Sequence, residues 1–141
     1  MNFDLGKCIG ELNSALFKKI VERNKSFGFD ITPVHGAIIC AIMKNGELCQ
    51  KDIEEYVSCN KSTLSSILDT MERNDLIIRT ESKTDSRKKI IKLTSKAKEI
   101  HNFLVNDKKY IENILKKDIT SEELSSFLEI ANRIKSSLER N

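Results

Sequence analysis

A mainly α-helical fold with one small β-hairpin is the architecture that this sequence predicts. Along most of the chain, apolar residues recur at three- and four-residue steps, as they do on one face of an amphipathic helix. Residues 77–93 differ, because two short isoleucine-rich runs there flank a polar loop, a pattern typical of paired strands. In residues 50–94 a short helix, a turn, a second helix and this hairpin follow one another. That order predicts a winged helix-turn-helix.

The N-terminal part predicts two helices. The first, over residues 4–26, is amphipathic and ends near Gly28. Its apolar positions are Leu5, Cys8, Ile9, Leu12, Leu16 and Ile20. Thr32 then precedes Pro33, a pairing typical of an N-cap followed by proline at the first helical position. We expect the second helix to continue to about Lys44, where Asn45-Gly46 ends it.

The next two helices form the predicted helix-turn-helix. A short helix is expected over residues 50–57, and Asn60 can cap a second one that runs to about Arg73. Asn74-Asp75 would close this second helix, since both residues tolerate a left-handed backbone. Its inner face holds four apolar residues, Leu64, Ile67, Leu68 and Met71, whereas its outer face offers Lys61 and four hydroxyls, Ser62, Thr63, Ser65 and Ser66.

Positive charge is concentrated on the hairpin, with strands expected at 77–81 and 89–93. Residues 79–92 contain six cations and two anions, a net charge of +4, although the whole chain carries only +3. A local concentration of cations is an electrostatic footprint for phosphates. The alternative is a hairpin that its lysines merely keep solvated.

Two further helices follow the hairpin. Thr94 can cap a long fifth helix that runs to about Lys117, and Thr120 with Glu123 forms a capping box that opens a sixth. Helices that are apolar on one face must bury that face, and a small winged-helix lobe offers too little surface to cover them all. We therefore expect a homodimer in which the terminal helices of two copies pack together.

Other classes of protein find less support. The sequence has no glycine-rich phosphate loop and no nucleophile elbow, so we predict no enzyme and no cofactor. Four widely spaced cysteines are expected to be reduced and mostly buried, and two histidines, His35 and His101, lie far from a metal-binding pattern. No apolar run is long enough for a membrane span and no secretory signal is visible, so we expect a cytoplasmic protein.

The order of elements resembles that of the MarR family of bacterial transcriptional regulators, over nearly the whole chain. The matching motifs are Lys61-Ser62-Thr63-Leu64-Ser65, Leu76-Ile77-Ile78-Arg79, Asp85-Ser86-Arg87 and Leu93-Thr94. In that family an Asp-x-Arg pair marks the wing. The resemblance implies that Arg87 enters a minor groove while Asp85 orients the wing by pairing within the protein.

The remaining candidate contacts follow from this resemblance and from the chemistry of the side chains. Hydroxyls at 62, 63, 65 and 66 can meet base edges, although such residues also cap and solvate ordinary helices. Four further cations would mainly meet phosphates, with strand alternation able to turn one of them away: Arg79, Lys83, Lys88 and Lys89. Two residues depart from the family pattern, Glu54 where alanine is common and Asp75 where glycine is usual.

The resemblance also implies an organisation and a role. Residues 1–141 would form a single domain, with a DNA-binding lobe at 32–94 and dimerisation helices at 1–31 and 95–141. Its partners would be double-stranded DNA, a second copy and a small-molecule effector, and its role that of a homodimeric repressor at a pseudo-palindromic promoter site. Two alternatives stay open: a winged-helix module that binds proteins instead of DNA, and a redox-responsive regulator that uses Cys8.

Overall fold

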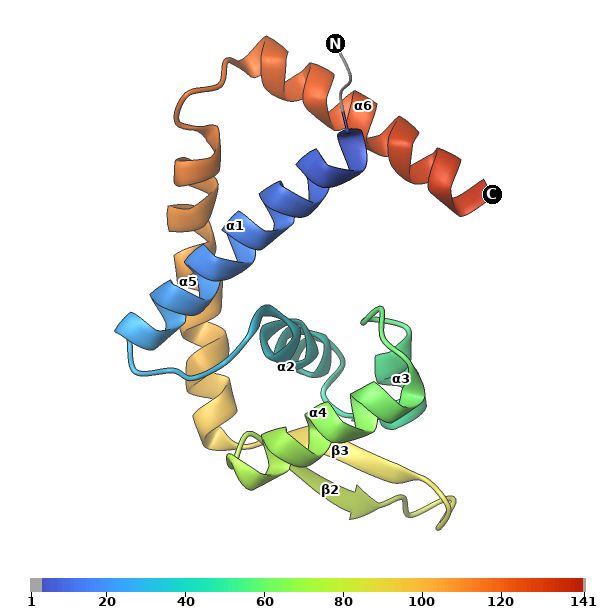
Figure 1. Ribbon diagram of the computed structural model, residues 1–141. Helices are drawn as coiled ribbons and strands as arrows, with labels where there is room; N and C mark the ends of the chain where they lie inside the picture. The colour runs from blue at the N-terminus through green and yellow to red at the C-terminus, as the bar shows by residue number, and fades with distance from the viewer. Residues whose placement is uncertain (1–3, 141) are drawn as a thin grey trace. The chain divides into compact units, whose positions relative to one another are not determined.

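The computed structural model describes residues 4–140, and contacts within the chain divide it into two compact units, residues 1–105 and 106–141. The elements in chain order (Figure 1) are α1 (Leu5–Ser26), α2 (Pro33–Asn45), β1 (Leu48–Cys49), α3 (Gln50–Glu54), α4 (Lys61–Arg73), β2 (Ile77–Glu81), β3 (Lys89–Leu93), α5 (Ser95–Lys116) and α6 (Ser121–Arg140). The predicted fold class is confirmed. Within residues 4–140, no helix is both long and apolar enough to cross a lipid bilayer.

The predicted helix starts are confirmed by the hydrogen bonds that cap them. At the start of α2 the Thr32 hydroxyl accepts from the His35 amide at 3.5 Å, and the His35 Nδ1 accepts from the Thr32 amide at 3.2 Å. At the start of α4 the Asn60 Oδ1 accepts from the Thr63 amide at 2.7 Å. Each bond satisfies an amide that has no partner inside the helix.

The helix α3 is shorter than predicted, because it ends at Glu54 and not at residue 57. The amides of Glu55 and Tyr56 bond to carbonyls three residues back, at Asp52 and Ile53. This tightens the last turn and ends the α-helix there. Val57, beyond the end of the helix, is nevertheless buried in the core.

The sheet has three strands in the order β1-β3-β2, and both pairings are antiparallel. The bounds of β2 and β3 agree with the two predicted strands. No sequence pattern predicted β1, since two residues, Leu48 and Cys49, are too few to show an alternation. They pair with Ile91 and Ile90 of β3 and attach the start of α3 to the sheet.

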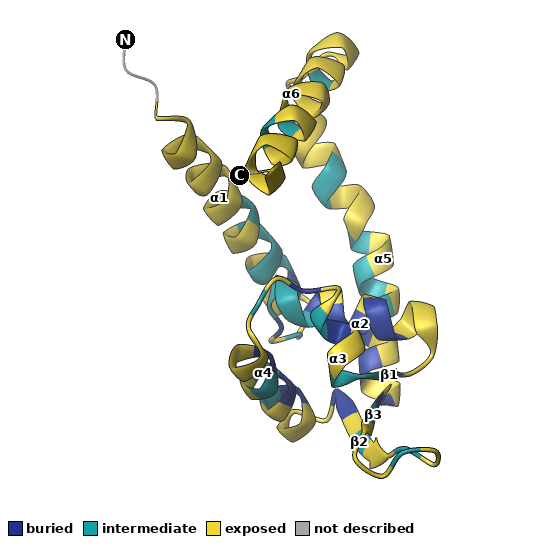
Figure 2. Ribbon diagram, turned by 90° about the vertical axis from the view of Figure 1, so that its right-hand side faces the viewer, coloured by how far each residue is buried: buried dark blue, intermediate teal, exposed yellow. Residues whose placement is uncertain are grey.

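The core of the first unit lies between α2, α4, the sheet and the start of α5, where Figure 2 shows most of the buried segments. The inner face of α4 packs there as predicted, with Ile67 only half-buried. The largest fully buried side chains are Asn24, Ile38, Ile39, Ile42, Ile53, Leu64, Leu68, Met71, Ile77, Ile91 and Ile100. Burial of this apolar surface is what holds α4 against the sheet.

Thr94 joins the turn after α4 to the start of α5. Asp75 adopts a left-handed backbone with φ of 59°, as predicted for the end of the second helix of the helix-turn-helix. The Thr94 hydroxyl donates to the Asp75 carbonyl at 2.6 Å, and the Thr94 amide donates to the Leu76 carbonyl at 3.1 Å. The same hydroxyl accepts from the Ala97 amide at 3.2 Å and so caps α5.

Two terminal helices leave their apolar faces largely uncovered, each considered within its own unit. On α1, Leu5, Ile9 and Leu12 are all exposed, and Leu12 keeps 56% of its surface accessible. In the second unit no residue of α6 is buried, although Thr120 and Glu123 form the predicted capping box at its start. The apolar side chains on these faces are not buried by other residues of the part of the chain that the structure describes.

We predict that the stability of the protein falls as the pH drops below the usual pKa of histidine. Burial lowers the pKa of His35 below its usual 6.5, while Asp30 opposes this to a smaller extent. The unfolded chain therefore binds more protons than the folded one below pH 6.5, so acid favours unfolding. Above that pH the contribution of His35 is constant.

His35→Gln keeps a side-chain acceptor at the third helical position but cannot titrate near neutrality. Thermal unfolding of both proteins from pH 8 to pH 5 should show a smaller loss of midpoint temperature for the variant. An equal loss in the two proteins would show that His35 does not cause the pH dependence.

Candidate nucleic-acid interface

The outer face of α4 is exposed to solvent because its inner face is held in the core. Leu64 and Leu68 are buried, whereas Lys61, Ser62 and Thr63 are exposed. Ser66 is exposed as well, and its hydroxyl donates to the Ser62 carbonyl at 3.3 Å. The structure thus places three of the four predicted hydroxyls on the surface of this helix.

Ser65 has a different position from the other three hydroxyls. It is half-buried, and its oxygen accepts a hydrogen bond of 2.8 Å from the Gln50 side chain. Gln50 is the first residue of α3, so this bond joins the two helices of the helix-turn-helix. It favours one spacing between them.

The wing consists of β2, β3 and the tip at Ser82–Lys88, and the tip is ordered by its own polar groups. The Ser82 amide donates to the Lys88 carbonyl, and the Lys88 amide donates to the Asp85 carbonyl, both at 3.0 Å. The Asp85 Oδ1 accepts from the Arg87 amide at 3.0 Å and from the Arg87 Nε at 3.4 Å. The Arg87 side chain is still 91% exposed. Asp85 therefore orients Arg87 without covering it.

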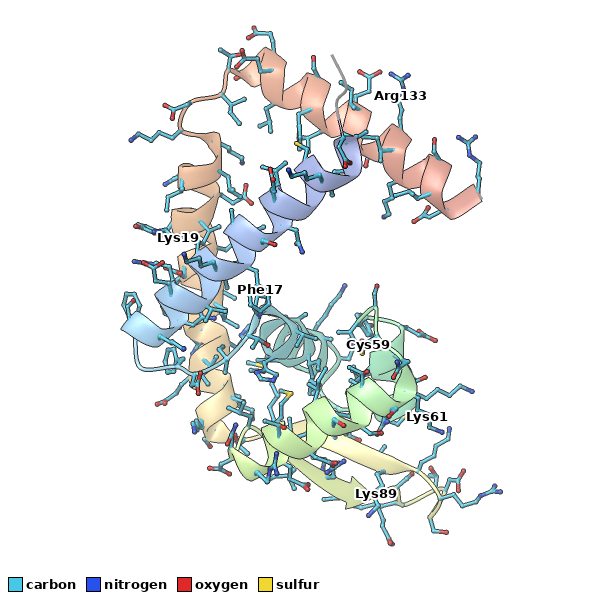
Figure 3. All side chains as sticks on the ribbon, viewed as in Figure 1. Phe17, Lys19, Cys59, Lys61, Lys89 and Arg133 are labelled. Atoms are coloured by element: carbon cyan, nitrogen blue, oxygen red, sulfur yellow. The ribbon has the colours of Figure 1, made fainter. Side chains whose placement is uncertain are left out.

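An open cleft of about 600 Å³ lies where α3, α4 and the wing meet. We call it the cationic cleft, because it is lined by five cations and one carboxylate: Lys51, Lys61, Arg87, Lys88, Lys89 and Glu54, with Cys49, Gln50 and Ser65 completing its walls. Figure 3 labels Lys61 at the start of α4 and Lys89 at the start of β3. Such a cluster creates a positive potential that attracts phosphate groups.

One carboxylate beside this cleft has a partner of its own. The thiol and the amide of Cys49 both donate to the Asp52 Oδ2, at 3.0 and 3.1 Å. These two hydrogen bonds lower the pKa of Asp52, and nearby Lys88 and Lys51 lower it further. Asp52 thus stays ionised and satisfies the first turn of α3.

Two of the predicted wing cations lie outside the cationic cleft. Lys83 is exposed at the tip and lines a second hollow that it shares with Glu81 and Lys92. Arg79 stands opposite the fully buried Ile91, so the strand register turns its side chain toward α4. Of the four cations predicted to meet phosphates, Arg79 is therefore the one whose side chain strand alternation turns away from solvent.

Arg79 is held by two carboxylates of α4. Its Nε and Nη2 donate to the two carboxylate oxygens of Glu72 at 3.3 and 3.1 Å, and Nη2 donates to Asp69 at 2.6 Å. The hydrogen bonds to Glu72 and then to Asp69 raise the pKa of Arg79, and in return lower the pKa of Glu72. Only 21% of the Arg79 side chain is exposed.

Four residues of the cleft were absent from the predicted set, Cys49, Gln50, Lys51 and Glu54, and the two of them able to donate to phosphate through their side chains are Gln50 and Lys51. Both occupy the first turn of α3, a helix whose interpretation from sequence rested on its inward apolar residues. The short strand β1 brings this turn beside β3 and the wing, and that pairing was not visible in the sequence. A lysine two residues before the buried Ile53 was the available signal.

The prediction that the cysteines are mostly buried is wrong. All four are reduced thiols, Cys8 and Cys40 are exposed, and Cys49 and Cys59 are half-buried. The histidines also differ from each other, because His35 takes part in the cap of α2 whereas the buried Nδ1 of His101 has no hydrogen-bond partner among the described residues.

Comparison with known proteins agrees with this architecture. The family model described as the MarR family matches residues 31–89. The HTH-type transcriptional regulator SarZ of Staphylococcus epidermidis is 29% identical over 114 residues, which cover 81% of this chain and 74% of that protein. The same identity and coverage hold for SarZ of a second strain of that species.

Solved structures show the same fold at low sequence identity. The S. aureus MepR–DNA complex has a TM-score of 0.84 at 23% identity, with 96% of this chain and 99% of that chain covered. A mutant of MarR from E. coli complexed with operator DNA has a TM-score of 0.83 at 19% identity, with 92% of each chain covered. The PcaV regulator from Streptomyces coelicolor has a TM-score of 0.83 at 17% identity, with 99% of this chain and 100% of that chain covered.

The fold and the arrangement of its surface define a winged helix-turn-helix protein. Residues 31–89, from just before α2 to the first residue of β3, match the MarR family model, and the chain is similar over 114 residues to the transcriptional regulator SarZ.

Proposed function

We propose that this chain is a homodimeric transcriptional repressor that binds double-stranded DNA through α4 and the wing. The observation that carries the proposal is the cationic cleft, where five cations from three separate elements converge beside the exposed hydroxyls of α4. Two proteins of the same fold, MarR and MepR, have structures in complex with DNA, which supports the same use here.

The exposed residues divide into three kinds of DNA contact. Ser62, Thr63 and Ser66 would reach base edges in a major groove, where short hydroxyls permit a close approach. Arg87 would enter the adjacent minor groove, held in its orientation by Asp85. The lysines of the cationic cleft, joined by Lys83 at the tip, would meet backbone phosphates and fix the register.

Ser65 and Arg79 support this surface from within. Ser65 fixes the spacing of α3 and α4 through Gln50, and its hydroxyl hydrogen remains able to donate outward. Arg79 joins β2 to α4 through its carboxylate pairs, so its part in DNA binding is indirect.

The homodimer accounts for the apolar faces of the terminal helices. Leu5, Ile9 and Leu12 on α1 are exposed in one chain, as are Phe127 and Leu138 on α6. A second copy would bury these faces, and a twofold axis would place two α4 helices about one helical turn of DNA apart. The matching operator would be pseudo-palindromic.

Repression follows from binding alone, because a dimer that occupies a promoter blocks it. Release by a small effector is the remaining part of the proposal. Such an effector would act through its different affinity for the two spacings of the α4 helices, one that fits DNA and one that does not. A hollow of about 230 Å³ lies beside the end of α4 and is lined by Phe29, Leu76 and Lys96 among others. A ligand bound there would be placed to change the spacing of the α4 helices.

We predict that Arg87→Ala weakens binding to the DNA upstream of the protein's own gene by about tenfold or more. Fluorescence anisotropy across a salt series measures this.

Lys51→Ala and Lys88→Ala should weaken binding to all sequences alike and each lower the salt slope by about 1. Lys18→Ala, which removes an exposed lysine of α1, is the matched control and should have little effect.

Weak binding that is indifferent both to DNA sequence and to Arg87 would overturn the proposal. It would favour instead a winged helix that binds other proteins.

We also predict that Leu12→Asp converts the dimer to a monomer, because it places a charge in the apolar face of α1. Sedimentation velocity at micromolar concentration measures the change. Asn13→Asp adds the same charge one residue away at an exposed polar position and should leave the dimer intact. Wild-type protein that sediments only as a monomer would contradict the dimer.

A further inference from the structure

Arg79 lies between the sheet and the helix proposed to read DNA. On β2 it is opposite the buried Ile91 and two residues beyond the buried Ile77, so all three share the face of the sheet that α4 covers. Its guanidinium reaches both Asp69 and Glu72 of α4, with N–O distances of 2.6 and 3.1 Å. Three hydrogen bonds hold it there.

The two carboxylates stand close to the surface that would face DNA. Ser62, Ser66 and Asp69 are separated by four and three residues, so they lie along one face of α4. The Asp69 side chain is 60% exposed. A carboxylate at that position repels the phosphates on either side of a groove, and Glu72 adds a second negative charge one turn further along.

The other two cations of α4 have different positions or partners. Lys61 lies at the opposite end of the helix and lines the cationic cleft. Arg73 donates to the Thr70 hydroxyl at 3.1 Å. Arg79 is the cation that the structure places within ion-pairing distance of both Asp69 and Glu72.

We propose that Arg79 is a positioning residue that offsets one of the two negative charges of Asp69 and Glu72 and so permits α4 to approach DNA. This inference rests on the proposed function. It assigns to Arg79 a role that differs from a phosphate contact, since a phosphate would have to displace the two carboxylates that already accept from the guanidinium. It also differs from a purely structural clamp, because the result depends on cancelled charge and not on the bond as such.

The test compares two variants that break the same ion pairs with opposite effects on charge. Arg79→Gln leaves two uncompensated carboxylates and should weaken DNA binding by about tenfold at low salt, less as salt screens them. Asp69→Asn/Glu72→Gln leaves an unopposed cation and should bind at least as tightly as the wild type. The triple variant that combines all three substitutions should bind at least as tightly as the wild type, because its three side chains carry no charge whereas the wild-type three sum to −1.

Other outcomes overturn the inference. If both Arg79→Gln and Asp69→Asn/Glu72→Gln weaken binding, Arg79 is a structural clamp. If the triple variant stays as weak as Arg79→Gln, the arginine contacts a phosphate directly. If Asp69→Asn lowers affinity for the selected site but not for unrelated DNA, Asp69 contacts a base directly. Binding then does not depend on offsetting its charge.

The failure of this inference is distinguishable from the failure of the proposed function. If the wild-type protein binds DNA and Arg87→Ala weakens that binding, the proposed function stands, whatever the Arg79 variants show. Thermal unfolding of each variant, followed by circular dichroism, confirms that the compared proteins are folded at the temperature of the binding assay.

Discussion

The packing of α4 on the sheet is the constraint on which the rest of the surface depends. Leu64, Leu68 and Met71 are fully buried against a core that includes Ile77 and Ile91 of the two wing strands. Because a helix has one inward face, this contact decides that the hydroxyls point outward. The same contact decides that β2 turns every second side chain toward the helix, and it thereby withdraws Arg79 from the wing surface.

The distribution of charge on the wing follows from this register. A net charge of +4 over residues 79–92 predicts one basic hairpin, but the structure divides those cations among different tasks. Arg79 pairs with α4, Lys92 pairs with Glu47 at 3.4 Å, and Arg87, Lys88 and Lys89 line the cationic cleft. The cleft regains positive charge from Lys51 and Lys61, which come from outside the hairpin. Net charge along a segment is therefore a weaker guide than the side of the strand on which each cation lies.

Local features could be predicted from the sequence, and features that need distant contacts could not. Thr32 with Pro33, Asn60, and Thr120 with Glu123 are each read within four residues, because a cap is a short-range hydrogen bond. The strand bounds 77–81 and 89–93 were also correct. The two-residue β1 depends instead on pairing with β3, some forty residues further along the chain. Gln50 and Lys51 were missed for that reason.

Under the proposed function, recognition of DNA and association of two copies are linked. The hydroxyls of α4 are short, and the helix has no exposed glutamine or asparagine, between Lys61 and Arg73, for a bidentate contact with a base. One copy alone therefore gains modest sequence discrimination. Joining two copies makes the second contact intramolecular, and its effective concentration multiplies the affinity without any new kind of contact. Loss of the apolar contacts on α1 and α6 would then weaken DNA binding although no residue at the DNA changes. The uncovered faces of the terminal helices therefore contribute to the proposed DNA recognition as much as the wing does.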